Sequence, residues 1–378
     1  MNTKPFLLCF GLLLCACSLF SQHKVHFIIQ KLPAYHQAND RIYLVGNFNN
    51  WNPSDQKLQL QNNSGKYGIT IELPKGMYEY KFTRGSWQKV ESGSNGVSTD
   101  NRRLLLESDT IINADIEQWS DHFPPPAKRS TSSKNVHVID TAFYIPQLNR
   151  YRRIWIYLPD AYCTTKNKYP VLYMHDGQNV FDEATSGFGE WGVDEALDTL
   201  EAQTKECIVV AIDNGAEKRL NEYSPFDMEK YGKGEGDAYV DFLAKTLKPF
   251  IDKHYRTKKD VTNTFIAGSS MGGLISMYAI LKYPNVYGGA GVFSPAFWIA
   301  PKLLNYIYEK GKGIKGKIYF YAGKHESESM IPDMLSAFEK LHKVSSAQIE
   351  VIIRDEGKHN EPTWRKEFPL FYHWLMQD

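Results

Sequence analysis

One serine stands where a hydrolytic nucleophile is expected. Residues 262–282 read TNTFIAGSSMGGLISMYAILK, and Ser270 lies between Gly268 and Gly272 in a G-x-S-x-G pattern. The apolar first part of this segment predicts a buried strand, and the second part has the periodicity of a helix that packs on a sheet. A serine hydroxyl is a poor nucleophile until a base accepts its proton, and a strained strand-to-helix turn is where hydrolases present such a serine. Ser270 is therefore the candidate nucleophile.

The partners of such a serine should follow it in the order acid, then histidine, each in a loop behind a strand. His359 fits the base, because it follows the last predicted strand and a glycine near the end of the chain. For the acid, Glu326 in the preceding post-strand loop leads, with Glu328 and Asp355 as alternatives. The carboxylate would fix the imidazole tautomer and stabilise the imidazolium that forms when the serine is deprotonated.

An oxyanion hole would complete the site. In a strand-turn-helix hydrolase it combines the N–H of the residue after the nucleophile, here Met271, with an N–H from the loop after an earlier strand. The segment HDGQNVFD fits that loop, and we favour the N–H of Gln178, with Gly177 as the alternative. Asp176 and Asp182 are interpreted as residues that brace the loop. No metal ligands are expected, because no His-carboxylate cluster has ligand spacing.

Several segments together resemble a known family. They are YPVLYMHDGQNVFD, EWGVDEALD, VVAIDNG, EYSPF, IAGSSMGGLISMYA, FSPAFW and EGKHNEPTW, and they are similar to the putative esterase family that contains feruloyl, acetyl-xylan and enterochelin esterases. The resemblance runs from about Val136 to the end of the chain. It implies an α/β-hydrolase fold and a triad of Ser270, His359 and Glu326, with no cofactor.

Family resemblance and loop position also suggest the pocket walls. Loops at the carboxyl ends of parallel strands form the crevice of such sheets. On this basis the substrate-binding residues are expected to be Trp191, Arg219, Tyr223 and Trp298.

The front of the chain reads as a separate module. Residues 23–118 consist of short β-prone runs separated by turn residues, which predicts a small antiparallel immunoglobulin-like β-sandwich. Residues 119–136 include the segment DHFPPPAKRSTSSKN and are predicted to be a linker. Residues 137–378 form the predicted α/β-hydrolase domain, so the chain is expected to have two folded domains.

The module resembles starch- and glycogen-binding modules, notably that of the AMP-activated kinase β subunit, through VGNFNNWNP, MYEYKF and RGSW. The resemblance implies that Trp51 and Trp87 stack on glucose rings while Lys81 and Asn101 reach hydroxyl groups. A flat indole can cover the apolar C–H face of a sugar. The alternative is that Trp51 plugs the sandwich and the module is a spacer.

The first 21 residues carry a short positive segment and an apolar run of signal-peptide length. They predict an exported protein, periplasmic or secreted, cleaved after Ser21, or a lipoprotein anchored through Cys17. The formal net charge of +1 points to no nucleic-acid partner. Of the remaining cysteines, Cys163 and Cys207 could pair in an oxidising compartment or stay as separate thiols.

These features predict an exported serine carboxylesterase that removes acetyl or feruloyl-type groups from carbohydrate, with the module holding the enzyme near a polysaccharide. Two alternatives remain open: a siderophore trilactone esterase with a basic pocket, and a non-catalytic glycan-binding protein. Transfer of the acyl group to an alcohol is also possible if the pocket excludes water.

Overall fold

The computed structural model describes residues 22–123, 128–200 and 204–377. The chain divides into two compact units, Met1–Pro126 and Ala127–Asp378. The predicted signal peptide and Cys17 lie outside the described residues. Among the residues described, no helix has both the length and the apolar character needed to cross a membrane.

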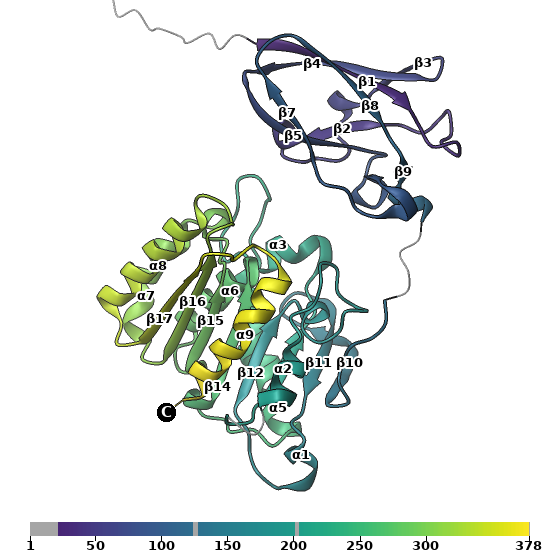
Figure 1. The fold of residues 1–378 in the computed structure, drawn as a ribbon. Helices are drawn as coiled ribbons and strands as arrows, with labels where there is room; N and C mark the ends of the chain where they lie inside the picture. Colours follow the sequence, from purple (N-terminus) through teal and green to yellow (C-terminus); the bar gives the residue numbers. More distant parts are fainter. Residues whose placement is uncertain (1–21, 124–127, 201–203, 378) are drawn as a thin grey trace, which may run out of the picture. The chain divides into compact units, whose positions relative to one another are not determined.

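The first unit is a small β-sandwich (Figure 1). Its larger sheet has the order β3-β4-β1-β8, and the smaller sheets are β2-β5-β7 and β6-β9. The pairing of β1 with β8 is parallel, which departs from the predicted all-antiparallel arrangement. Apolar residues of both sheets, such as Phe27 and Phe82, form the core. The strands are β1 (Gln22–Lys31), β2 (Tyr43–Gly46), β3 (Gln61–Asn63), β4 (Lys66–Pro74), β5 (Gly76–Thr83), β6 (Glu91–Ser92), β7 (Arg102–Leu106), β8 (Thr110–Asp115) and β9 (Gln118–Trp119).

The predicted linker of residues 119–136 is too long at its amino-terminal end. Trp119 is fully buried in the core of the sandwich. Its backbone N–H donates to the hydroxyl of Tyr35 at 2.9 Å, and its indole N–H donates to Nδ1 of His36 at 3.1 Å. The segment around Trp119 therefore belongs to the module, because a buried tryptophan needs both apolar neighbours and a partner for its N–H.

The linker is also too long at its carboxyl-terminal end. Ser130 and Thr131 both donate to the carboxylate of Asp182, at 3.0 and 3.1 Å, and the N–H of Ser133 donates to Asp194 Oδ2 at 2.7 Å. Both aspartates are buried. The serine- and threonine-rich composition that predicted a linker thus supplies hydrogen-bond donors to buried carboxylates of the second unit.

The second unit is built on one eight-stranded sheet with the order β10-β11-β13-β12-β14-β15-β16-β17. β10 and β11 form an antiparallel pair, β11 also pairs antiparallel with β13, and the other pairings are parallel. The four central strands, β13, β12, β14 and β15, are buried along their whole length and mostly apolar, as expected for parallel strands covered on both faces. The strands of this sheet are β10 (Val136–Ile145), β11 (Arg150–Tyr157), β12 (Val171–His175), β13 (Ile208–Ile212), β14 (Thr264–Ser269), β15 (Gly289–Phe293), β16 (Lys317–Gly323) and β17 (Gln348–Arg354).

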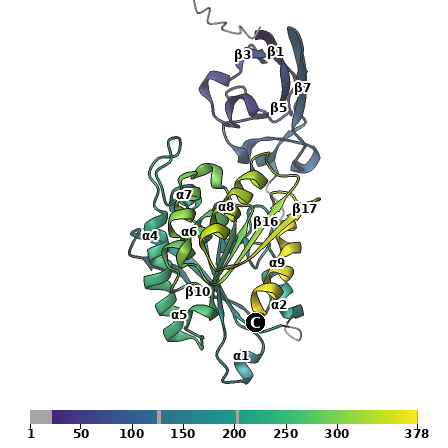
Figure 2. The same ribbon diagram turned by 90° about the vertical axis from the view of Figure 1, so that its left-hand side faces the viewer.

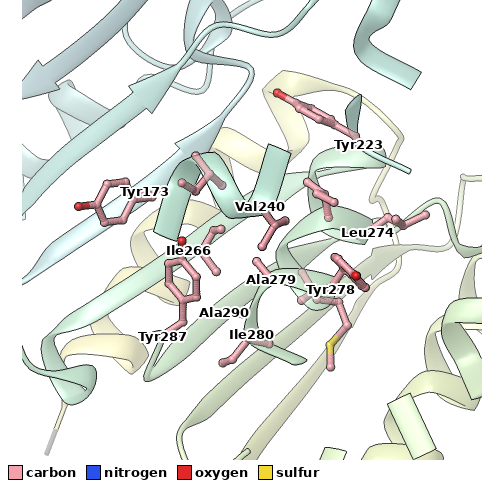
Figure 3. Close-up of a cluster of buried hydrophobic side chains, with 14 of the residues drawn as sticks. Tyr173, Tyr223, Val240, Ile266, Leu274, Tyr278, Ala279, Ile280, Tyr287 and Ala290 are labelled. Atoms are coloured by element: carbon pink, nitrogen blue, oxygen red, sulfur yellow. The ribbon is translucent and has the colours of Figure 1, made fainter. Parts of the chain in front are cut away.

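Helices cover both faces of this sheet (Figure 2). α2 (Val193–Leu200) and α9 (Glu361–Met376) pack on one face. The helices of the other face are α4 (Gly236–Phe242), α5 (Lys248–His254), α6 (Met271–Lys282), α7 (Lys302–Lys310) and α8 (Met330–Val344). Apolar side chains of these helices and of the sheet form a core on this face. Figure 3 shows part of it, where Val240 and Leu274 of the helices lie over Ile266 and Ala290 of the sheet. Single turns form α1 (Ala161–Thr164) and α3 (Arg219–Glu222).

The helical segment that contains α4 and α5 is interrupted by a π-helical turn. Helical backbone runs from Gly236 to His254, but residues Leu243–Leu247 form a π-helical turn between α4 and α5. Pro249 is the second residue of α5, and its missing N–H and its ring disturb the regular α-helical hydrogen bonds before it.

Candidate active site

Ser270 occupies the turn between β14 and α6. Its backbone has φ 59° and ψ −120°, a conformation that costs energy for any residue other than glycine. The turn is held by the bond from the Ser270 N–H to the carbonyl of Phe293 at 2.9 Å and by the bond from the Ala296 N–H to the Ser270 carbonyl at 3.1 Å. A Cβ atom at Gly268 would lie 3.0 Å from the backbone of Gly272. The glycines therefore permit the close approach that a nucleophile turn requires.

The structure brings His359 and Glu326 together behind β17 and β16. Nδ1 of His359 lies 2.7 Å from Oε2 of Glu326, whose side chain is fully buried. The other oxygen of Glu326 accepts from the N–H of Gly323 and from the hydroxyl of Ser294, each at 2.7 Å. When Nδ1 donates to this carboxylate, Nε2 is left as the basic nitrogen of the ring.

The two alternative acids lie elsewhere. Asp355 is exposed and forms an ion pair with Lys324 at 2.8 Å, and Glu328 is exposed in the loop before α8. Of the three candidate carboxylates, Glu326 alone contacts the histidine among the described residues.

Sequence reasoning missed two residues that hold this pair. Ser294 follows β15 with φ 43°, is fully buried, and accepts a hydrogen bond at 2.9 Å from the indole N–H of Trp364 while it donates to Glu326. The Trp364 ring packs edge-on against the ring of His359, with centroids 5.1 Å apart. A serine directly after a buried strand in a sheet of this kind is the signal that could have identified Ser294.

The loop behind β12 forms a tight turn beside the segment that follows Ser270. Asp176 has left-handed backbone angles, φ 58° and ψ 47°. A Cβ atom at Gly177 would lie 2.8 Å from the backbone of Asp213, so the position requires glycine. The side chain of Gln178 accepts from the N–H of Asn214 at 3.1 Å, and its carbonyl accepts from the hydroxyl of Thr185 at 2.8 Å. The backbone of Gln178 is therefore fixed from two sides.

Arg219, an expected substrate-binding residue, is paired with a carboxylate of the loop behind β12. Its guanidinium binds both carboxylate oxygens of Asp176, at 2.6 and 2.9 Å, and Asn214 Nδ2 donates to the same carboxylate at 2.7 Å. Burial opposes ionisation of Asp176, but these partners outweigh it and keep the pKa of that carboxyl below its ordinary value. The positive charge of Arg219 is thus compensated within the loop framework.

Two further predicted pocket residues are buried. Trp191 stacks on Trp364, with ring centroids 5.7 Å apart, inside the core between the sheet and α9. Tyr223 has no exposed surface, and its hydroxyl accepts from the Asp176 N–H at 3.2 Å. Both residues support the loops of the site and do not line an open pocket. The prediction failed because aromatic residues near a site pack below its loops as readily as they face the substrate.

His175 packs against the glycines on either side of Ser270. Its Nδ1 is 3.0 Å from the hydroxyl of Tyr239, and its Nε2 has no partner among the described residues. Burial lowers the pKa of His175 to about 4, although Asp176 next to it favours the charged form. The ring is therefore neutral near pH 7 and acts as packing for Gly268 and Gly272.

Two exposed aromatic side chains belong to loops that adjoin segments of the site. Trp298, in the turn after β15, is 53% exposed, close in sequence to Ala296, which binds the Ser270 carbonyl. Phe188 is 83% exposed and was not predicted. The loop of Phe188 lies beside the start of α9. A Cβ atom at Gly189 would lie 3.7 Å from Cβ of Glu361, which follows His359 by two residues.

Asn179 ties the loop of Phe188 to the segment that carries the histidine. Its Nδ2 donates to Oε1 of the buried Glu361 at 3.2 Å, and its Oδ1 accepts from the N–H of Gly187 at 3.1 Å.

A cavity of about 670 Å³ lies at the opposite edge of the sheet. Its lining includes Thr262, which precedes β14, and Gln348, the first residue of β17. That cavity contains none of the predicted catalytic side chains.

Within residues 22–123, 128–200 and 204–377, no group of three or more His, Cys, Asp or Glu side chains could hold a metal ion. Asp182 binds the backbone and hydroxyl donors of the segment before β10, and Asp176 binds Arg219, so both aspartates serve the loops.

In the first unit the two predicted glycan-binding tryptophans lie next to each other. The rings of Trp51 and Trp87 have centroids 6.2 Å apart at an angle of 42°, and Trp87 is 43% exposed. Trp51 is half-buried, with a positive φ of 57°. The pair could present a bent apolar surface to a sugar chain.

Lys81 does not project toward a ligand. It is buried, and its ammonium group donates to the carbonyl of Thr99 at 2.6 Å, to the Thr99 hydroxyl at 3.2 Å and to the carbonyl of Asp100 at 3.3 Å. These contacts use all three donors of an ammonium group. Asn101, next to this loop, donates to Glu79 at 3.1 Å. Lys81 therefore positions the loop, contrary to the predicted direct contact with sugar.

A serine on a strand-turn-helix of a mostly parallel sheet, with an acid and a histidine behind later strands, defines an α/β-hydrolase. Residues 145–370 match the family described as "Putative esterase", and the chain belongs to that family. It is a carboxylic ester hydrolase. Residues 29–101 match the family described as "Glycogen recognition site of AMP-activated protein kinase".

Individual relatives fit this assignment. The uncharacterized protein YbbA of Bacillus subtilis is 25% identical over 239 residues, which cover 59% of this chain and 92% of that protein. An endo-1,4-beta-xylanase/feruloyl esterase of Xylanibacter ruminicola is 26% identical over 216 residues, which cover 56% of this chain and 27% of that protein. The crystal structure of the enterobactin esterase from Shigella flexneri has a TM-score of 0.54 at 16% identity, covering 93% of this chain and 92% of that one. At this identity the structural similarity shows a shared fold.

Proposed function

We propose that this protein is a serine carboxylesterase that hydrolyses acyl esters on carbohydrate, with Ser270, His359 and Glu326 as its catalytic triad. The observation that carries the proposal is the 2.7 Å contact between His359 Nδ1 and the fully buried carboxylate of Glu326. A buried carboxylate on a histidine ring orients the imidazole and stabilises its protonated form during catalysis.

In the proposed reaction the Ser270 hydroxyl attacks the ester carbonyl and transfers its proton to Nε2 of His359. The tetrahedral intermediate collapses, the bond to the leaving alcohol breaks, and that alcohol takes the proton from the histidine. Water, activated by the same histidine, then releases the acid and restores the serine. The oxyanion is expected to accept hydrogen bonds from the N–H groups of Met271 and Gln178. Met271 opens α6, where backbone N–H groups have no partners inside the helix.

The aromatic side chains at the site support an acyl group with a ring. Trp298 and Phe188 are both exposed although they are large and apolar, and an exposed aromatic near a nucleophile is an inexpensive contact surface for a substrate ring. The relative with feruloyl esterase in its name is consistent with this choice.

The carbohydrate part of the proposal is supported by the first unit. Its match to a glycogen recognition site and the neighbouring indoles of Trp51 and Trp87 favour a module that binds a glycan. Export, with or without a lipid at Cys17, remains part of the proposal and is supported by the composition of residues 1–21.

A panel of three esters tests the function. Acetylated xylan, methyl ferulate and a catecholate trilactone are each offered to the full chain, with Ser270→Ala as the control for background hydrolysis. We expect the wild type to hydrolyse acetylated xylan and methyl ferulate, and Ser270→Ala to hydrolyse neither. If the trilactone is hydrolysed in preference to the other two esters, the proposed substrate changes from an acylated carbohydrate to a siderophore. If none of the three esters is hydrolysed, the proposed substrate class is wrong.

A further inference from the structure

A second hollow opens at the same edge of the sheet as Ser270. It has a volume of about 330 Å³ and is lined by Thr141, Tyr151, Arg152, Arg153, Asp213 and Asn214. Asp213 and Asn214 follow β13, and the arginines stand at the start of β11, which is antiparallel to β13. The hollow therefore faces the carboxyl ends of the parallel strands, where ligands bind in sheets of this type.

An aromatic pair borders this hollow. Tyr144 of β10 and Tyr151 of β11 are register partners, their ring centroids are 5.2 Å apart, and they are 45% and 62% exposed. The hydroxyl of Tyr144 is fixed by the side chain of Asn149 at 3.0 Å. Two adjacent tyrosines that the core does not bury form a ready surface for the apolar face of a sugar ring.

The polar wall of the hollow is rigid. Asp213 accepts from Arg153 Nε at 2.9 Å and from the indole N–H of Trp155 at 2.8 Å, and the guanidinium of Arg153 lies 4.5 Å above the Trp155 ring. Arg153 carries five N–H donors, so its outer nitrogens can serve hydroxyl groups while Nε holds Asp213. Because the charges of Arg153 and Asp213 compensate each other, this wall offers hydrogen-bond donors and acceptors without a net charge. Such a surface suits a neutral ligand that is rich in hydroxyl groups.

Asn214 connects this hollow with the catalytic loop. Its N–H donates to the side chain of Gln178 at 3.1 Å, and its side chain donates to Asp176 at 2.7 Å. β13 is separated from β14, which carries the nucleophile, by β12 alone. At the usual spacing of strands β13 is therefore about 10 Å from β14, and β11 and β10, which carry the tyrosine pair, are about 15 and 20 Å from it. A chain of three or four sugar rings can span that distance.

We propose that Tyr144, Tyr151, Arg153, Asp213 and Asn214 form a subsite for the neutral sugar chain that carries the ester. The inference rests on the proposed function and deepens it, since it assigns the leaving-group side of the substrate to the β10–β11 side of the site. An acyl group bound at Ser270 and a glycan bound at the tyrosine pair would then use the same edge of the sheet.

The kinetic test uses the full chain and two feruloyl esters. In Tyr151→Ala, kcat/KM for a feruloylated arabinoxylo-trisaccharide should fall about five- to tenfold, the range expected for one lost aromatic contact. The loss should appear in KM, and methyl ferulate, which has no sugar, should be hydrolysed at the wild-type rate. Tyr308→Ala removes a tyrosine of similar exposure, 55%, on α7 and should leave both substrates unaffected.

Binding provides a readout that does not need turnover. In a Trp51→Ala, Trp87→Ala background, which removes the predicted stacking residues of the first unit, calorimetric titration with xylohexaose should detect an affinity that Tyr151→Ala weakens. Equal loss on both esters together with unchanged xylohexaose affinity would overturn the subsite. If the wild type hydrolyses neither ester, the proposed function falls, and the titration still decides the subsite.

Discussion

The two units hold their proposed functional residues in different ways. In the second unit, His359, Glu326, Ser294 and Trp364 form a continuous set of contacts around a fully buried carboxylate. In the first unit the proposed ligand contacts are two indoles at the surface, while the lysine expected to bind sugar is used inside the module. Proton transfer requires atoms placed within tenths of an ångström, whereas stacking on a sugar tolerates displacement, so only the catalytic residues need a rigid framework.

The largest expected effect is at the nucleophile. Ser270→Ala should lower kcat for methyl ferulate by about 10³-fold or more, because members of a triad act as a unit and no other group replaces the attacking oxygen. Far-ultraviolet circular dichroism and migration in glycogen gels should be unchanged. Residual activity above a few per cent of wild type would exclude Ser270 as the nucleophile.

The carboxylates give the next effect and a matched comparison. Glu326→Gln should reduce kcat by about 10²-fold or more, since an amide no longer stabilises the imidazolium and can favour the wrong tautomer. Glu328→Gln and Asp355→Asn change exposed carboxylates of neighbouring loops and should retain activity. Steady-state rates of the three variants decide the assignment, and a larger loss in either control would move the acid to that residue.

The first unit should show a smaller and selective effect. Trp87→Ala should weaken retardation in glycogen, amylose or xylan gels by about two- to tenfold, as expected for one aromatic contact, with hydrolysis of methyl ferulate unaffected. Leu105→Ala removes another exposed apolar side chain of the module and should change neither. Wild-type protein that migrates normally in all three gels would make the module a spacer.

Lys81 sharpens the same comparison. Because its ammonium group binds the loop of Thr99 and Asp100, Lys81→Met should lower the free energy of unfolding by about 1 to 3 kcal/mol through the unpaired acceptors it leaves. Urea unfolding of the variant measures this. A variant of wild-type stability that no longer binds glycan would instead return Lys81 to the ligand surface.

The smallest predicted effect concerns pH. Burial raises the pKa of Asp194 to about 8, so the folded chain keeps a proton that the unfolded chain releases above about pH 4. This group therefore makes the folded state less stable as pH rises from about 4 to 8. His175, with its lowered pKa, has the opposite effect between about pH 4 and 6.5.

Asp194→Asn removes the first of these titrations and keeps an acceptor for the Ser133 N–H. The unfolding free energy of the variant minus that of wild type should therefore increase as pH rises. His175 is present in both proteins, so its contribution cancels in this difference. Urea titrations at pH 5 and pH 8 provide the measurement, and a difference that does not depend on pH would contradict the prediction.

The sequence predicted what local patterns encode. The strand-turn-helix around Ser270 and the post-strand loops of Glu326 and His359 are read from a few consecutive residues, and the order of elements predicted an α/β-hydrolase behind a β-sandwich. Both the fold class and the family are confirmed. The catalytic roles stay predictions.

What the sequence could not provide depends on contacts between distant segments. Ser294 meets Glu326 only because β15 and β16 are neighbours in the sheet. Trp191 and Tyr223 are buried because α9 and the Asp176 loop cover them. The linker was placed too widely since nothing local reveals that Ser130 and Thr131 meet a buried aspartate.

The two cysteines of the described units offer an experimental handle. Cys163 is exposed in α1 and Cys207 is buried, and both are free thiols. Burial raises the pKa of Cys207 to about 12, so this thiol is almost never ionised at neutral pH and reacts slowly. Cys163 follows β11 at the edge of the sheet away from Ser270. A protein that begins at residue 22 can therefore carry one maleimide dye at Cys163 without mutation, and the fluorescence of that dye would report rotational freedom of the catalytic unit.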